Sequence, residues 1–292
     1  VSLLKAVYPR IKAVDPNATV IAGASTSGAV KKGWLEEIVK LGALDVCDAI
    51  SIHSYNYSEP FPQRGPEACS TWMTTVQEML RGYHDGKDIP FYVTEMGWPT
   101  HVTRGGTDPE LAASYLARLY LLARTSESFE GLWWYDFQDD GWDPKYNEDN
   151  FGLVRPDLTP KPAYYVMADI SQLVGKGQYV GRIETPDEHV RGLRFTREGR
   201  DYWTLWSDDD QDRQIVLQTE HPETPVLVRR LGHDASLVQW GFRDWADQRG
   251  AETAPNRMSI VVGHRPFILS GDLAGVSVVE VMPRFRQAEE TR

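Results

Sequence analysis

Short apolar runs alternate with amphipathic patterns through roughly the first 175 residues. The apolar runs predict four buried strands, over 19–24, 49–55, 90–95 and 131–137. Apolar residues recur at helical spacing in the segments between and after them, over 34–44, 70–83, 107–122 and 162–174. Strands that alternate with helices in this way are βα units, and such units imply a parallel sheet.

The pattern changes after residue 175, where helical periodicity stops. Short strand candidates follow, separated by charged or glycine-containing turns, over 179–183, 190–196, 202–207, 214–218, 226–231, 236–240, 258–262 and 267–269. They predict an antiparallel β-sandwich of about eight strands. The expected organisation is therefore an α/β domain over 1–175, an all-β domain over 176–283 and a polar tail over 284–292.

The starts of two predicted helices carry information. Asp108 suits a helix cap and Pro109 suits a first helical turn. The chain opens without Met, and Leu3, Val7 and Ile11 already follow helical spacing. We expect from this a piece of a longer protein, in which any targeting signal lies outside the sequence.

Composition narrows the possible partners. The 292 residues carry a net charge of −11, with Lys and Arg scattered, which argues against nucleic acid. No apolar stretch is long enough to span a bilayer, so membrane insertion is not expected. Cys47 and Cys69 are expected to be two buried thiols, although a disulfide between them is the alternative. The acidic segment 143–149 lacks a twelve-residue calcium loop, and we predict no metal and no cofactor.

Three of the four predicted strands end in aromatic, imidazole and carboxylate side chains. These segments are His53-Ser54-Tyr55-Asn56-Tyr57, Thr94-Glu95-Met96-Gly97-Trp98 and Trp133-Trp134-Tyr135-Asp136-Phe137. The carboxyl ends of parallel strands share one edge of a sheet, and functional side chains of α/β barrels lie there. An open doubly wound sheet is the alternative fold, but no glycine-rich phosphate loop follows any strand.

The segment Phe91–Trp98 resembles the seventh-strand motif of the large clan of retaining (β/α)₈ glycoside hydrolases, in which an apolar strand ends in Thr-Glu or Ser-Glu. Four further segments resemble the clan in matching order: Ile11–Pro16 the helix before strand five, His53-x-Tyr55 strand six, Trp133-Trp134-Tyr135 strand eight, and Asn150–Tyr164 the segment after it. The resemblance implies that 1–175 form the C-terminal half of a (β/α)₈ TIM barrel, strands five to eight, followed by an accessory β-sandwich.

The resemblance also implies an activity: hydrolysis of O-glycosyl bonds in a β-linked poly- or oligosaccharide by the retaining mechanism. Glu95 would be the nucleophile and Tyr55 the donor that orients it. Trp134 would form the sugar platform, with His53, Trp98 and Asp136 also contacting substrate. Secreted or periplasmic location is common among such enzymes.

Retaining hydrolysis needs two carboxyl groups about 5–5.5 Å apart. In the clan the acid/base is a Glu after strand four, in a part of the barrel that precedes this sequence. Glu59 and the aspartates after the fourth predicted strand are possible substitutes, but no spacing recommends them. We therefore expect the 292-residue chain alone to be inactive or barely stable, and the activity to belong to the intact parent protein.

Structural roles compete with these assignments. Glu95 could be a surface carboxylate, His53 a satisfied core histidine, and Trp98 and Trp133 packing residues. Aspartates at 136, 139 and 140 could cap a loop or hold a basic group.

Two other functions compete with hydrolysis. A degenerate barrel that binds a glycan without cleaving it would use the same aromatic side chains without needing the Glu95 nucleophile. Alternatively, the β-rich domain is itself a carbohydrate-binding module, with stacking faces from Trp203, Trp206, Trp240 and Trp245.

Overall fold

The computed structural model describes residues 1–209, 211–232, 237–242 and 254–283. The chain separates into two compact units, Val1–Asp108 with Leu122–Thr159 and Pro109–Leu121 with Pro160–Arg292. No helix in the described ranges has the length and apolar content required to cross a bilayer.

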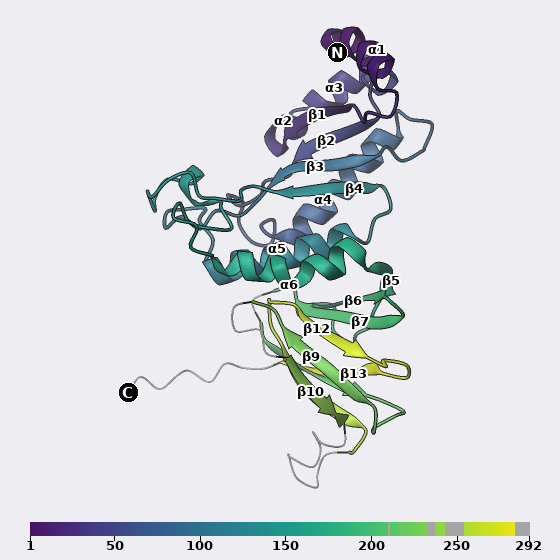
Figure 1. Cartoon of the computed structure of the whole chain (residues 1–292), viewed down its shortest axis with the longest axis vertical. Coiled ribbons are helices and arrows are strands. Elements are labelled where there is room, and N and C mark those ends of the chain that lie inside the picture. Colours follow the sequence, from purple (N-terminus) through teal and green to yellow (C-terminus); the bar gives the residue numbers. More distant parts are fainter. Residues whose placement is uncertain (210, 233–236, 243–253, 284–292) are drawn as a thin grey trace. The chain divides into compact units, whose positions relative to one another are not determined.

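The first unit is built on one four-stranded parallel sheet, which confirms the predicted parallel arrangement. Its strands lie side by side in chain order (Figure 1): β1 (Ile21–Thr26), β2 (Ala49–His53), β3 (Phe91–Met96) and β4 (Phe129–Trp134). The described residues close no barrel, because β1 and β4 are the outer strands of an open sheet.

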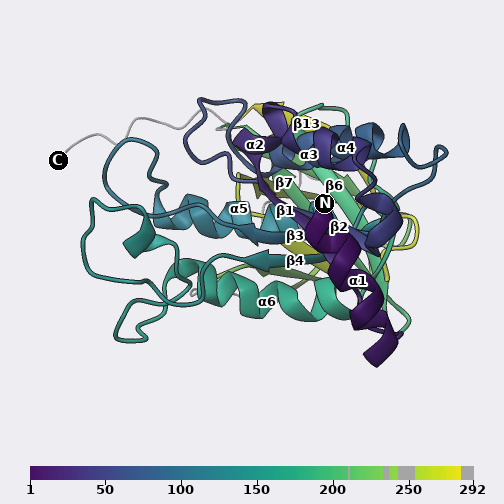
Figure 2. The same ribbon diagram turned by 90° about the horizontal axis from the view of Figure 1, so that it is seen from above.

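Helices connect these strands, and α1 lies nearest the viewer in Figure 2. The helical segments are α1 (Ser2–Val14), α2 (Ser27–Lys31), α3 (Trp34–Lys40), α4 (Pro66–Arg81) and the 3₁₀ turns η1 (Leu44–Val46) and η2 (Glu148–Asn150). Helix α4 starts four residues before its predicted start, because Pro66 occupies its first turn. Its apolar side chains Met73, Val76 and Leu80 are buried.

Two strand boundaries differ from the predicted ones for identifiable reasons. Strand β1 extends to Thr26 because a bulge between Gly23 and Ser25 shifts its pairing with β2. A side chain at Gly23 would collide with the carbonyl oxygen of Ser51, 2.5 Å away. Strand β4 stops at Trp134 instead of residue 137, because the backbone N–H of Asp136 donates to the carbonyl of Phe151, which lies outside the sheet.

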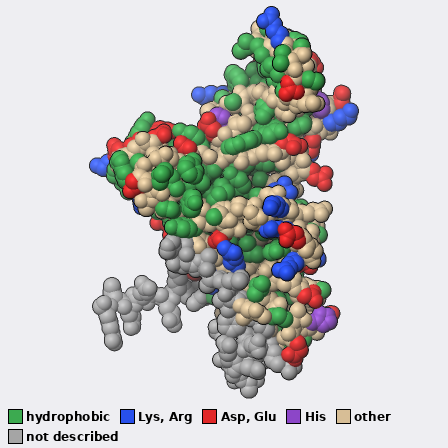
Figure 3. Space-filling model, viewed as in Figure 1, with side chains coloured by type: hydrophobic (Ala, Val, Ile, Leu, Met, Phe, Trp, Pro, Cys, Tyr) green, Lys and Arg blue, Asp and Glu red, His purple; other side chains and the backbone are tan. Residues whose placement is uncertain are grey.

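The loop after β4 runs from residue 135 to 161 and contains much exposed apolar surface. Figure 3 shows these side chains gathered over the loops at the end of β4. Exposed members within the loop are Phe137, Trp142, Tyr146 and Leu158.

The described residues of the second unit form α5 (Pro109–Ala123, of which Pro109–Leu121 belong here), α6 (Pro162–Lys176) and nine antiparallel strands. Both helices begin at the predicted prolines. The strands are β5 (Gln178–Arg182), β6 (Val190–Arg197), β7 (Arg200–Ser207), β8 (Arg213–Gln218), β9 (Pro225–Arg230), β10 (Leu237–Gly241), β11 (Arg257–Val262), β12 (Phe267–Gly271) and β13 (Ser277–Pro283). They form a six-stranded sheet, β10-β9-β12-β7-β6-β5, and a three-stranded sheet, β11-β8-β13.

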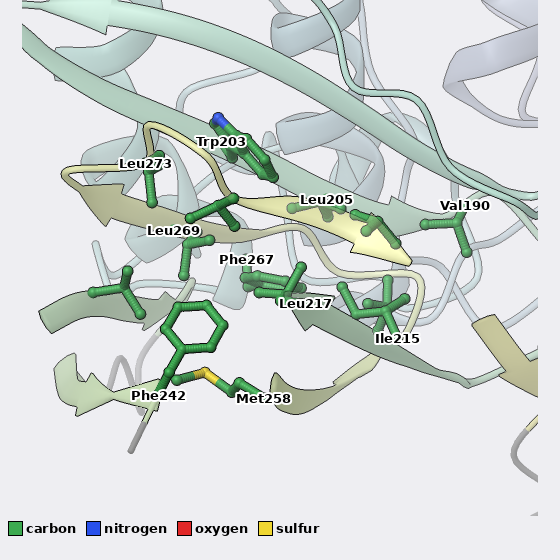
Figure 4. Close-up of a cluster of buried hydrophobic side chains, with 14 residues drawn as sticks. Val190, Trp203, Leu205, Ile215, Leu217, Phe242, Met258, Phe267, Leu269 and Leu273 are labelled. Carbon is green, nitrogen blue, oxygen red and sulfur yellow. The ribbon is translucent and has the colours of Figure 1, made fainter. Parts of the chain in front are cut away.

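One hydrophobic cluster takes side chains from both antiparallel sheets (Figure 4). Leu205 and Leu269 come from the six-stranded sheet, while Ile215, Leu217 and Met258 come from the three-stranded sheet. Alternate residues of β7, β8, β11 and β12 belong to this cluster, as the period of two requires.

Two of the four tryptophans considered as stacking faces of a carbohydrate-binding module are buried in this unit. Trp203 and Trp206 are buried. Trp240 lies in β10, but its side chain is outside what the structure describes. Trp245 lies outside the described residues altogether. Two of the four candidates are therefore core residues.

Candidate active site

Three neighbouring strands bring the predicted side chains to one edge of the parallel sheet. His53, the last residue of β2, is in register with Glu95 near the end of β3. Met96, the last residue of β3, is in register with Trp134 at the end of β4. Because the strands are parallel, all of these residues lie at the carboxyl edge.

Glu95 is held by two side chains from β2 and the loop after it. The hydroxyl of Tyr55 donates to Oε2 of Glu95 at 3.2 Å, and Nδ1 of His53 lies 3.3 Å from the same oxygen. Nε2 of His53 lies 3.1 Å from Oγ1 of Thr94. Nδ1 of His53 thus faces the carboxylate, while Nε2 of the same ring shares a hydrogen bond with the threonine hydroxyl.

The carboxylate remains accessible despite these contacts, because its side chain is 40% exposed. It is therefore neither a core group nor a freely solvated one.

Tyr55 is fixed by rings on three sides. Its ring meets Tyr57, Tyr135 and Phe151 edge-on, at centroid distances of 6.0, 6.4 and 5.7 Å. Burial raises the pKa of Tyr55, and the negative charge of Glu95 raises it further. The phenol is therefore protonated and acts as a hydrogen-bond donor at neutral pH.

Trp98 and Trp134 lie beside each other, with ring centroids 5.9 Å apart. Trp98 is 1% exposed, and its indole N–H donates to Oδ1 of Asn56 at 3.1 Å. Trp134 is half-buried. Trp98 is thus buried beside Trp134, and the contact of Trp98 with substrate stays a prediction.

The aspartates after β4 have different environments. Oδ1 of Asp139, a buried side chain, accepts from the N–H of Gly152 at 2.7 Å, which is the loop-capping role anticipated as an alternative. Asp136 is half-buried and accepts from the N–H of Phe137, its neighbour in the chain. Asp140 is exposed.

Sequence reasoning assigned no role to two residues that complete this geometry. Thr94 fixes the imidazole, as described above, and Asn56 holds the loop after β2. Nδ2 of Asn56 donates to the carbonyls of Gln63 at 3.0 Å and Gly65 at 2.8 Å, while Oδ1 of Asn56 accepts from the indole N–H of Trp98. The only feature of the sequence that could have indicated this role is the position of Asn56, a polar residue, inside the aromatic segment 53–57.

The described residues contain no group of three or more His, Cys, Asp or Glu side chains arranged to hold a metal ion. The two cysteines are free, Cys69 buried and Cys47 half-buried. The chemistry that this edge of the sheet can supply is therefore that of an accessible carboxylate with a tyrosine hydrogen bond and an imidazole on one oxygen.

No family model and no curated protein matches the sequence. Solved structures do match. A family 39 glycoside hydrolase from Bacteroides cellulosilyticus WH2 is similar with 26% identity and a TM-score of 0.70, over 93% of this chain and 54% of that one. The fold is that of a glycoside hydrolase.

Two further neighbours agree at lower identity. A glucosidase from Croceicoccus marinus matches with a TM-score of 0.60 and 12% identity, over 95% of this chain and 64% of that one. A family 39 β-xylosidase from Caulobacter crescentus matches with a TM-score of 0.56 and 15% identity, over 92% of this chain and 61% of that one. The chain thus spans less than two thirds of the length of these neighbours.

Proposed function

We propose that this chain is the C-terminal part of a retaining glycoside hydrolase that cleaves a β-linked poly- or oligosaccharide, with Glu95 as the nucleophile. The observation that carries the proposal is the convergence of Tyr55 and His53 on Oε2 of Glu95 at the carboxyl edge of the sheet. A glycosidase nucleophile must stay ionised, and donors to its oxygen favour the charged form.

The proposed organisation follows from the same comparison. Residues 1–175 would be strands five to eight of a (β/α)₈ barrel, and 176–283 a β-sandwich accessory domain. The family 39 neighbour supports this, since 93% of this chain covers 54% of that protein. The acid/base carboxyl group would come from the preceding half of the barrel.

In the proposed mechanism, Oε1 of Glu95 attacks the anomeric carbon while Oε2 is held by Tyr55 and His53. The C–O bond to the leaving group breaks as the ester to Glu95 forms, and the acid/base group protonates the departing oxygen. Water then hydrolyses the ester with the same group acting as base. Trp134, supported by Trp98, offers a ring face to the sugar.

Replacement of the carboxylate tests the role of Glu95. In the full-length protein we expect Glu95→Gln to lower kcat on aryl β-glycosides by at least about 10³-fold, because the amide cannot form the glycosyl ester. A 2-deoxy-2-fluoro glycosyl fluoride of the cleaved sugar should label the parent protein at Glu95, as read by peptide mass spectrometry.

Glu59→Gln is the matched control. Its side chain is 39% exposed, close to the 40% of Glu95. Its carboxylate is paired with Lys31, the last residue of α2, at 2.9 Å. We expect near-parental turnover from this variant. Unchanged turnover in Glu95→Gln would eliminate the proposed role, and glycan binding without labelling would favour a binding protein that does not cleave.

A further inference from the structure

The loop after β4 exposes three aromatic rings within ten residues. Phe137, Trp142 and Tyr146 are 58%, 65% and 54% exposed. Figure 3 shows hydrophobic side chains gathered over the loops at the end of β4. Large apolar side chains on a soluble protein are normally buried, and a group of exposed ones marks a surface that binds something.

The backbone beneath these rings is fixed by the side chains of its own loop. Nδ2 of Asn150 donates to the carbonyls of Asp143 at 2.8 Å and Tyr146 at 2.7 Å. The carboxylate of Asp149 accepts from the N–H of Asp143 at 3.0 Å. It also packs against Gly141, where a side chain would approach it to 2.3 Å. The aromatic side chains are therefore presented on an ordered scaffold, which lowers the entropic cost of binding.

The neighbouring loop after β3 adds two further attachments. The N–H of Val102 donates to the carbonyl of Pro144 at 2.7 Å, and the hydroxyl of Thr103 donates to that of Lys145 at 3.1 Å. Two loops thus hold the segment between Trp142 and Tyr146 in place.

The same segment is connected to the candidate site. Nδ2 of Asn147 donates to the hydroxyl of Tyr57 at 3.3 Å, and the ring of Tyr57 lies 6.0 Å from that of Tyr55. Tyr55 in turn holds Glu95. A chain of direct contacts therefore runs from the exposed loop to the candidate nucleophile.

The charges of the loop indicate what kind of molecule fits it. Asp140 and Asp143 are exposed and lie between the three aromatic residues in sequence, together with one exposed cation, Lys145. The whole chain carries a charge of −11. A polyanion would be repelled. An apolar protein partner would have to desolvate these carboxylates. A neutral polyhydroxyl chain meets both demands, because its C–H faces stack on aromatic rings and its hydroxyl groups donate to carboxylates.

We propose that Phe137, Trp142 and Tyr146 form a second glycan-binding surface for sugar units beyond those at Glu95. This surface, here called the distal platform, rests on the proposed function for its link to catalysis. It makes the natural substrate a neutral glycan chain of several residues, and it predicts a preference for long over short substrates.

Direct binding tests the distal platform without any need for turnover. In affinity electrophoresis of the full-length protein we expect at least one of soluble xylan, mixed-linkage β-glucan and hydroxyethylcellulose to retard migration. Trp142→Ala and Tyr146→Ala should each weaken that retardation about fivefold, the loss of roughly one aromatic contact. Tyr83→Ala is the control, an exposed tyrosine that follows α4 and precedes β3, at the opposite edge of the sheet.

Kinetics distinguish a distal surface from a general defect. We expect Trp142→Ala to raise KM about fivefold on the matching hexasaccharide, with kcat unchanged, and to leave an aryl monoglycoside unaffected. Parental thermal midpoints would confirm that the variants fold.

Three results would overturn the distal platform. The first is no retardation of the parent protein by any of the polysaccharides, and the second is equal retardation of Trp142→Ala, Tyr146→Ala and Tyr83→Ala. The third is a loss of self-association on sedimentation as the only effect of Trp142→Ala. Failure of the proposed function is separate, because it is read from Glu95→Gln turnover. Retardation that persists while Glu95 proves dispensable would retain the platform and remove the nucleophile.

Discussion

At the scale of single residues, the hydroxyl of Tyr55 has the most specific task. It donates to one oxygen of Glu95 while three neighbouring rings hold its own ring in place. Tyr55→Phe in the full-length protein keeps the ring contacts and removes the donor. We expect kcat to fall about thirtyfold, because a hydrogen bond to a charged group contributes about 2 kcal/mol. An unchanged kcat on aryl β-glycosides would show that the hydroxyl is dispensable.

The pH profile of the same variant gives a second readout. Burial and the charge of Glu95 raise the pKa of Tyr55 above its ordinary value of about 10. The phenol therefore stays protonated as pH rises through 10 and does not titrate in the working range. We expect the alkaline limb of kcat/KM to be the same in parent and Tyr55→Phe. A limb that disappears in the variant would assign that titration to Tyr55.

The sequence predicted the members of this site better than their contacts. The strand ends placed His53, Tyr55 and Glu95 at one edge, because parallel strands share a carboxyl edge. It did not place Asn56 against Trp98, since that contact depends on how the loop after β2 folds back onto its own carbonyls. Burial of Trp98 was anticipated only as an alternative, because aromatic residues at strand ends occur both inside and outside a barrel.

At the scale of elements, Arg213 joins segments of the β-rich unit. Lying at the start of β8 and almost fully buried, it bonds Asp209 at 2.6 and 2.8 Å, Asp187 at 2.8 Å and Ser207 at 2.7 Å. Ser207 ends β7, so the arginine connects the three-stranded sheet with the six-stranded one. Removal of one partner leaves a buried charge undercompensated.

Asp209→Asn should therefore lower the free energy of unfolding by about 2 kcal/mol at pH 7. The hydrogen bond from Arg213 holds the pKa of Asp209 well below its usual range. Its stabilising charge is thus fully present above the unfolded value of about pH 4 and is lost as pH falls through the folded one. Urea titrations should show the gap between parent and variant closing in acid.

Asp201→Asn provides the comparison, because Asp201 meets Arg194 at 3.5 Å in a more exposed pair. We expect a change below about 0.5 kcal/mol from it. Equal losses for the two variants would contradict the special role of Asp209.

Element types were predictable where the hydrophobic period was clear, as in β2 and α6. Strand β13 was missed because a bulge between Val278 and Glu280 interrupts its alternation and leaves Val279 exposed. The end of β4 was misjudged for another reason: aromatic residues continue past Trp134, yet from Asp136 onward the backbone bonds to the loop. The hydrophobic pattern of a sequence depends on side chains alone, so it cannot predict where the backbone changes its hydrogen-bond partner.

At the scale of the molecule, the first unit contains a parallel sheet with two outer strands. Each of β1 and β4 has one neighbour, while β2 and β3 have two. Trp133 on β4 is stacked on Tyr92 of β3 at 5.8 Å and is half exposed. Parallel sheets are normally covered on both faces and protected at their edges. A further set of strands in the proposed full-length barrel would supply both kinds of protection.

Hydrogen exchange can test that arrangement strand by strand. We expect amides of β1 and β4 to exchange more slowly in the full-length protein than in the 292-residue chain, because each outer strand gains a hydrogen-bonded neighbour. Amides of β2 are the internal control, since they are paired on both sides already and should change least. Dye binding to exposed apolar surface should fall in parallel as Trp133 becomes covered. Equal exchange of β1 and β4 in the two proteins would mean that no barrel closes through these edges, and the proposed organisation would then be wrong even if Glu95 proved catalytic.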